Sequence, residues 1–161
     1  MTIAHDVFAE TNPAFCTYVL AAFVTSYLSM RKDGPEAPIS YLALPLALSG
    51  DLTSTFDGTN RNTGLLEWLE RNPHIQVGLS TRINASMNIV TDAIRFACFV
   101  QILDLDEAGR LQLGRSKLKK RAAKALSDEP ARSIKHAERL GFWFAMAGST
   151  RTVFDIMELT V

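Results

Sequence analysis

The stretch NPHIQVGLSTRINASMNIVTDAIRFACFVQILDLDEAGRLQLG, residues 72–114, decides the fold. Its middle carries Ile83, Met87 and Val90 at helical spacing, and a second apolar face includes Ala93 and Phe96. A helix that is apolar on two sides is normally buried. We therefore predict one long helix here, lying at the centre of the domain.

Two short alternating segments follow this helix. Leu103–Leu105 and Leu111–Leu113 flank the polar turn Asp106–Arg110, which contains Gly109, and this pattern predicts a β-hairpin. A long helix with a hairpin directly behind it is typical of the end of a winged-helix unit. The expected fold class is therefore mainly α with a small β-hairpin, a winged-helix-like α+β single domain.

Outside this stretch the chain is expected to be helical. Asn12 followed by Pro13 is a helix start, and the helix should run to about residue 30. Pro45 lies inside the apolar residues 39–48, which favours an extended segment or a broken helix. Further helical segments are expected in the following ranges: 63–71, about 74–80, 128–148, and a last helix capped by Ser149 or Thr150.

Length and composition favour one globular domain. The chain has 161 residues, of which 47% are hydrophobic and 21% charged. We divide it into a helical N-terminal part (1–71), the long helix with its hairpin (72–114), and a basic connector with C-terminal helices (115–161). The start of the chain does not resemble a secretory signal, and no apolar run has the ~18 residues of a membrane span. We expect a cytoplasmic protein without membrane contact.

The charges are unevenly distributed along a chain of zero net charge. Residues 1–114 hold 7 Lys and Arg against 12 Asp and Glu, whereas residues 115–161 hold 10 against 5. Six cations fall within ten residues, and they are the candidate contacts for DNA or for an acidic partner: Arg115, Lys117, Lys119, Lys120, Arg121 and Lys124. A solvated connector that contacts nothing is the alternative interpretation of this stretch.

Three consecutive aromatic residues stand in the helix expected at 128–148. Phe142, Trp143 and Phe144 project about 100° apart on a helix, so they cannot all face one core. We predict that Phe144 faces the core and that Phe142 and Trp143 are candidate protein-interface residues.

No pattern in the sequence predicts catalysis. His5, His74 and His136 lack partners at metal-ligand spacing, and neither a nucleophile motif nor a glycine-rich phosphate loop is present. We expect no catalytic residues, no metal site and no cofactor. The two cysteines, Cys16 and Cys98, lie on apolar helical faces and are expected to be reduced thiols.

A set of short motifs in a fixed order resembles the middle component of bacterial three-component ABC systems. The motifs are Asn12–Phe15, Leu42–Leu46, Leu65–Leu69, Asn72-Pro73, the hairpin Leu105–Leu113, Leu140–Gly148 and Thr152–Phe154. The resemblance covers nearly the whole chain. The resemblance includes no catalytic motif that could be assigned to residues of this chain.

The resemblance implies partners rather than a reaction. Such components are encoded between an SMC-like ABC ATPase and a third, variable component, as in Lamassu-type anti-phage defence. It implies a non-catalytic adaptor that links the ATPase to an effector, a nuclease being one candidate, and to double-stranded DNA through the complex.

The alternative is a free-standing winged-helix DNA-binding transcriptional regulator. Its recognition helix would present the polar residues at the start of the long helix: Ser80, Thr81, Arg82, Asn84 and Ser86. The acidic balance of residues 1–114 opposes the approach of phosphates to that helix.

Overall fold

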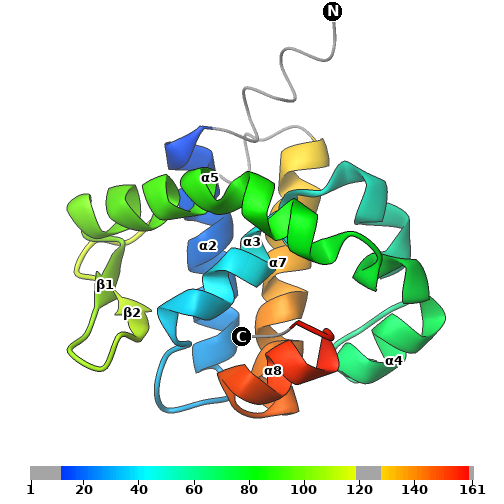
Figure 1. Ribbon diagram of the computed structural model, residues 1–161. Helices are drawn as coiled ribbons and strands as arrows, with labels where there is room; N and C mark the ends of the chain where they lie inside the picture. Colours follow the sequence, from blue (N-terminus) through cyan, green and yellow to red (C-terminus); the bar gives the residue numbers. More distant parts are fainter. Residues whose placement is uncertain (1–11, 119–127, 160–161) are drawn as a thin grey trace, which may run out of the picture.

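Helix α2 (Pro13–Leu28) forms the centre of the fold in the computed structural model, which describes residues 12–118 and 128–159. It packs along α7 (Asp128–Ala147) and also contacts α3 (Ser40–Leu48) and α5 (Leu79–Phe99). Figure 1 shows α5 crossing in front of the other helices rather than running between them. The described chain is mainly helical, with one two-stranded antiparallel hairpin.

The remaining elements connect and cover these helices. They are η1 (Ala37–Ile39), η2 (Gly50–Phe56), α4 (Gly64–Arg71), η3 (Pro73–Gln76), β1 (Leu103–Leu105), β2 (Leu111–Leu113) and α8 (Thr150–Ile156). The helix expected at about 74–80 is shorter, because Gly78 adopts a φ of 69° between η3 and the start of α5. A left-handed residue cannot continue a right-handed helix.

Two helix starts follow directly from their capping residues. The Asn12 side-chain oxygen accepts a hydrogen bond from the Ala14 N–H at 2.9 Å, with Pro13 in the first turn. The Ser149 hydroxyl accepts one from the Thr152 N–H at 3.1 Å at the start of α8. Both starts confirm the sequence prediction, since these side chains satisfy N–H groups that the helix itself leaves unpaired.

The segment around Pro45 is a continuous helix, so the expectation of an extended or broken segment is wrong. Residues 42–47 are all buried in α3, among them Leu42 and Leu46 at 0% exposure. Pro45 lacks the N–H that would bond to the carbonyl group of Tyr41. Burial on all sides outweighs this one missing hydrogen bond, because the apolar side chains of α3 pack against α2, α5 and α7.

The long helix α5 is not buried on two sides, and the prediction that it lies at the centre is wrong. Only four of its side chains are buried, namely Leu79, Val90, Ala93 and Ala97. Phe96 and Phe99, in contrast, are 37% and 85% exposed. The helix presents one face to α2 and α3, and no other described element packs over the face that carries Phe96 and Phe99.

The predicted hairpin is present with the expected strands. Leu103 pairs with Leu113 and Leu105 with Leu111. Gly109 takes a φ of 76° in the turn, a conformation that favours glycine. Leu103 and Leu111 are buried, and they anchor the hairpin on the core.

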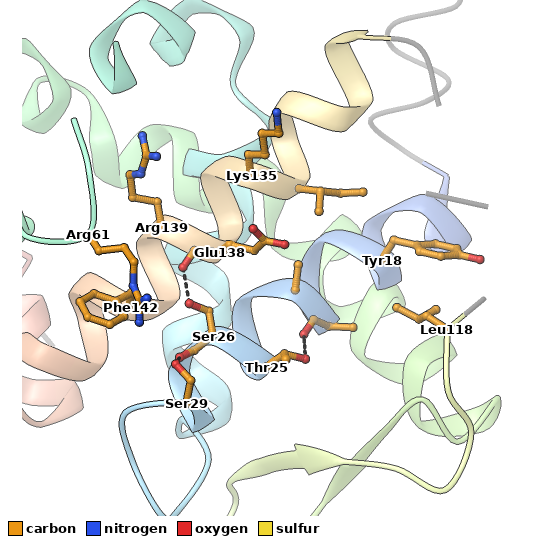
Figure 2. A pocket seen from close by; sticks show the side chains of 13 residues that line it. Tyr18, Thr25, Ser26, Ser29, Arg61, Leu118, Lys135, Glu138, Arg139 and Phe142 are labelled. Atoms are coloured by element: carbon orange, nitrogen blue, oxygen red, sulfur yellow. Dashed lines mark hydrogen bonds between the residues drawn. The ribbon is translucent and has the colours of Figure 1, made fainter. Parts of the chain in front are cut away.

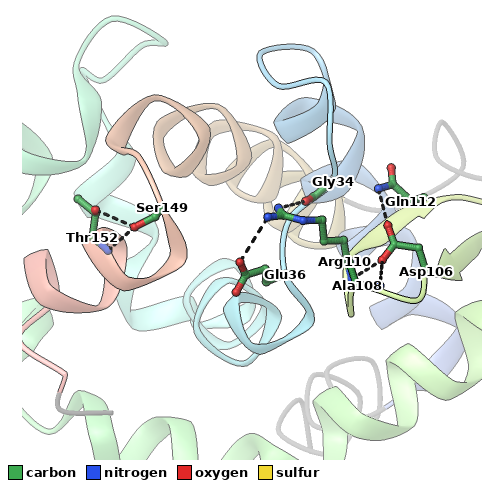
Figure 3. A network of polar contacts seen from close by, with 8 residues as sticks. All are labelled: Gly34, Glu36, Asp106, Ala108, Arg110, Gln112, Ser149 and Thr152. Carbon is green, nitrogen blue, oxygen red and sulfur yellow. Dashed lines mark hydrogen bonds and ion pairs between the residues drawn. The ribbon is translucent and has the colours of Figure 1, made fainter.

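The hairpin is fastened to the segment that follows α2. The Leu111 N–H donates to the Pro35 carbonyl oxygen at 2.8 Å, and the Ala37 N–H donates to the Gly109 carbonyl oxygen at 2.9 Å. The Arg110 guanidinium donates to the Gly34 carbonyl oxygen at 3.1 Å and pairs with Glu36 (Figure 3). These contacts fix the hairpin beside the α2–α3 connection.

Candidate functional site

A groove of about 820 Å³ runs between α2 and α7. Figure 2 shows it with Tyr18 and Leu118 at one end and Arg61 and Phe142 at the other. Side chains of α2 and α7 form most of its lining: Tyr18, Ala21, Ala22, Thr25 and Ser26 from α2 with Ser29 at its C-terminal end, and Ile134, Lys135, Glu138, Arg139 and Phe142 from α7. Arg61 and Leu118 complete it from two loops.

The spacing between the two helices is set by backbone contact below the groove. At Gly141 a Cβ atom would lie 2.4 Å from the Phe23 carbonyl oxygen, so only glycine allows this approach. The Ser26 hydroxyl donates a hydrogen bond to the Glu138 carbonyl oxygen, and the Arg31 side chain donates one to the Ala145 carbonyl oxygen at 2.9 Å. These bonds tie α2 to α7 along the groove.

The charged side chains of the groove are mostly cations. Among the described residues, Arg61, Lys135 and Arg139 line it together with a single acid, Glu138. Burial raises the pKa of the Glu138 carboxyl, while Lys135 and Arg139 act in the opposite direction. The Arg139 guanidinium donates to the Thr59 hydroxyl at 2.9 Å, which holds it at the groove wall.

Phe142 closes one end of the groove. Its ring is half-buried, and the Arg61 guanidinium carbon lies 4.3 Å from the ring centroid. A cation over an aromatic face is an attractive arrangement. The Phe142 ring therefore continues the apolar surface of the groove, and the Arg61 guanidinium lies at the end of that surface.

Trp143, in contrast, is a core residue, so its interpretation as an interface residue is corrected. It is 1% exposed, and its indole N–H donates to the Asn60 carbonyl oxygen at 3.1 Å. Its ring lies 5.5 Å from that of Trp68 and is stacked with Phe56. Phe144 is 0% exposed and faces the core as predicted.

The imidazole of His136 belongs to the same aromatic cluster. It stacks on Phe56 at a centroid distance of 4.0 Å and is 8% exposed. Burial, followed by the charge of Arg139, lowers the pKa of His136 to about 4. The ring is therefore neutral near pH 7, and it packs as an aromatic side chain rather than as a surface cation.

Only part of the predicted basic contact lies within the described residues. Arg115 and Lys117 are exposed, whereas Lys119, Lys120, Arg121 and Lys124 lie outside the described residues. Leu118 lines the groove. The structure thus brings the beginning of the basic stretch and Phe142 to opposite ends of one groove.

Sequence reasoning missed the α2 side of the groove. The apolar spacing of α2 indicates its core residues, and the remaining positions form the opposite face. These positions carry small and hydroxyl side chains, among them Ala22, Thr25 and Ser29. The signal in the sequence was the absence of charged residues from the outer face of α2, because solvated helix faces normally carry charged residues. Such a face indicates contact with another surface.

A sequence model of one protein family matches residues 2–160, and its description is "ABC-three component (ABC-3C) system Middle Component 3". The chain belongs to this family. The resemblance to the middle component of three-component ABC systems is therefore confirmed. No curated protein and no solved structure matches the chain.

In this Middle Component 3 chain, Arg82 is the residue at the polar start of α5 that binds other parts of the chain, whereas Ser80, Thr81 and Asn84 are exposed. The Arg82 guanidinium contacts both carboxylate oxygens of Asp51, at 3.0 and 2.8 Å, and donates to the Ser49 hydroxyl at 2.6 Å. The hydrogen bonds from Arg82 lower the pKa of the Asp51 carboxyl. Arg82 is thus held by an acid rather than presented alone to a phosphate.

The hairpin of this Middle Component 3 chain is acidic. Asp104 and Glu107 are exposed, and Asp106 accepts hydrogen bonds from the N–H groups of Arg110 and Ala108. Those hydrogen bonds lower the pKa of Asp106. Its one cation, Arg110, is bound to Glu36 and Gly34, so the hairpin presents acids to any approaching phosphate.

The described residues show neither a metal-binding cluster nor a membrane-crossing helix. Within residues 12–118 and 128–159, no three side chains of His, Cys, Asp or Glu are grouped so that they could hold a metal ion. In the same ranges, no helix combines the length and the apolar composition that crossing a bilayer requires.

Proposed function

We propose that this chain is a non-catalytic adaptor subunit that binds the other components of its ABC three-component system through the groove between α2 and α7. One observation carries the proposal. The groove joins an apolar surface, a cation-rich wall and the half-buried Phe142 ring in one open site. This combination suits a protein contact, since interfaces have an apolar centre with a polar rim and are enriched in aromatic residues and Arg.

We further propose that the system is of the Lamassu type, with an SMC-like ATPase as the direct partner and an effector, such as a nuclease, as the third component. The order of the sequence motifs supports this assignment. In such an assembly the adaptor links the ATPase to the effector as part of anti-phage defence. The whole chain would act as one domain, in which the long helix and its hairpin, residues 72–114, form a winged-helix-like unit.

We propose that this winged-helix-like unit contacts protein rather than DNA. The acidic hairpin and the Asp51–Arg82 ion pair support this choice, because both place carboxylates where phosphates would have to approach. DNA contact, if made through the complex, would use the basic stretch that begins at Arg115. The same acids oppose the free-standing transcriptional regulator.

The adaptor role is tested by co-expressing the three components of the system with an affinity tag on this chain. We expect the ATPase to co-purify in a fixed ratio and to keep its nucleotide hydrolysis. The purified chain alone should hydrolyse no nucleotide and cleave no DNA. A chain that purifies alone at every salt concentration, or that carries its own activity through successive columns, would contradict the proposal.

The role of the basic stretch in DNA binding is tested on the assembled complex with Arg115→Glu and Lys117→Glu combined. We expect weaker binding to duplex DNA and a smaller salt dependence, by roughly one unit of slope for each phosphate that the complex no longer neutralises. Lys32→Glu is the matched control, since Lys32 is exposed elsewhere on the chain. Equal affinity and slope in the unmodified complex and in both variants would assign the basic stretch to another role.

A further inference from the structure

We propose that the groove holds one amphipathic α-helix of a partner component, with its apolar side against α2 and acidic residues along its flanks. This inference rests on the proposed function, because it names the kind of segment through which another component binds the adaptor. The choice of occupant follows from the length, the lining and the charge of the groove.

The length and lining of the groove fit a short helix. Its α2 side extends from Tyr18 to Ser29, which at 1.5 Å per residue is about 16 Å, or three helical turns. The side chains between them are short, so a third helix can approach α2 at the 8–10 Å distance typical of packed helices. A groove between two neighbouring helices is a common binding site for an amphipathic helix.

The charge of the groove selects an acidic occupant. Within residues 12–118 and 128–159, neither Arg61 nor Lys135 forms an ion pair with an acid of this chain. Lys135 is exposed at the rim, and Arg61 is exposed above Phe142. Carboxylates on the flanks of a docked helix would pair with both cations, and the apolar side of that helix would cover Ile134 and Phe142.

A nucleic acid fits the same groove less well. The apolar lining, formed by Ala21, Ala22 and Ile134 among others, would gain nothing from a hydrated phosphate backbone. The apolar stripe of an amphipathic helix, in contrast, would cover this lining and remove it from water.

The first test changes the charge at the rim of the groove, where the acidic flank of the occupant would lie. Lys135 is exposed in α7, and both Glu and Arg are good helix formers, so Lys135→Glu and Lys135→Arg should fold equally well. We expect Lys135→Glu to weaken binding of the captured component about tenfold or more, and Lys135→Arg to preserve it. Thr25→Glu and Thr25→Lys should both weaken binding, because either puts a charge under the apolar side of the docked helix, and thermal melts check that each variant is folded.

Any other result of this test contradicts the inference that an acidic helix binds in the groove. Equal losses with Lys135→Glu and Lys135→Arg would mean that the groove is used but that its occupant is not acidic. Unchanged binding in both variants would mean that the partner binds elsewhere, and the adaptor role would survive. Failure of the unmodified chain to capture any component would refute the proposed function itself, so the two failures are distinguishable.

The second test identifies the occupant directly. A photo-crosslinking amino acid is placed at Ser29 in the groove of the assembled complex, and at Leu66, which is 61% exposed on α4, as the control. We expect the Ser29 position alone to crosslink to a partner peptide with helical apolar spacing and net negative charge. Crosslinks to a basic peptide, to duplex DNA or to a second copy of this chain would overturn the inference.

Discussion

Trp143 and Phe142 are neighbours in α7, and truncating each to alanine should have different consequences. Trp143 is 1% exposed within the cluster formed with Phe56 and Trp68. Removing a buried aromatic ring costs the transfer free energy of its atoms and leaves a cavity, about 3–5 kcal/mol together. Phe142 is half-buried, and its main specific contact is the Arg61 guanidinium at 4.3 Å.

The destabilisation caused by Phe142→Ala should be much smaller. A cation–π contact at an exposed site contributes about 0.5–1 kcal/mol, and part of the ring already faces solvent. For a chain of this size, each kcal/mol shifts the melting temperature by about 2–4 °C. We therefore expect Trp143→Ala to lower the melting temperature by roughly 10 °C, and Phe142→Ala to lower it by a few degrees.

The assay pairs a thermal melt of each isolated variant with capture of the partner components. The Phe142→Ala variant should stay folded and bind its partner more weakly. The main effect of Trp143→Ala should be a lower melting temperature of the isolated chain. Trp143→Phe serves as the control, because it keeps a ring in the cluster and removes the indole N–H bond to the Asn60 carbonyl oxygen together with a smaller part of the buried ring. A Trp143→Ala protein that melts like the unmodified chain would refute the assignment of this side chain to the core.

Two further predictions concern the helix contact and the buried imidazole. Gly141→Ala should destabilise the chain by about 1–3 kcal/mol in chemical denaturation, because the added methyl group would lie 2.4 Å from the Phe23 carbonyl oxygen and push α2 from α7. An unchanged unfolding midpoint would contradict the close approach. His136 has a pKa of about 4 in the folded chain, below its ordinary value of 6.5, so the unfolded chain binds its proton first. Stability should therefore fall by roughly 3 kcal/mol as the pH drops from about 6.5 to about 4. His136→Phe should remove this dependence, whereas His74→Gln, at an exposed histidine, should keep it.

Local signals in the sequence determined where most elements begin and end. Asn12 and Ser149 cap helices because their side chains reach N–H groups a few residues away, and such hydrogen bonds need no other part of the chain. The hairpin follows from alternating leucines around a turn with Gly109. The family was also readable from the order of short motifs along the chain.

Tertiary structure alone decided which apolar faces are covered. Periodicity predicted two apolar faces on α5, but the described residues cover only one of them, and Phe99 is 85% exposed. Phe142 and Trp143 have similar local signals, yet Phe56 and Asn60 bury the Trp143 indole, whereas the Arg61 side chain over Phe142 leaves that ring half-buried. The groove likewise depends on α2 meeting α7, more than a hundred residues apart in the sequence. Residue spacing fixes which side chains share a face, whereas coverage of that face depends on distant segments, which local patterns do not record.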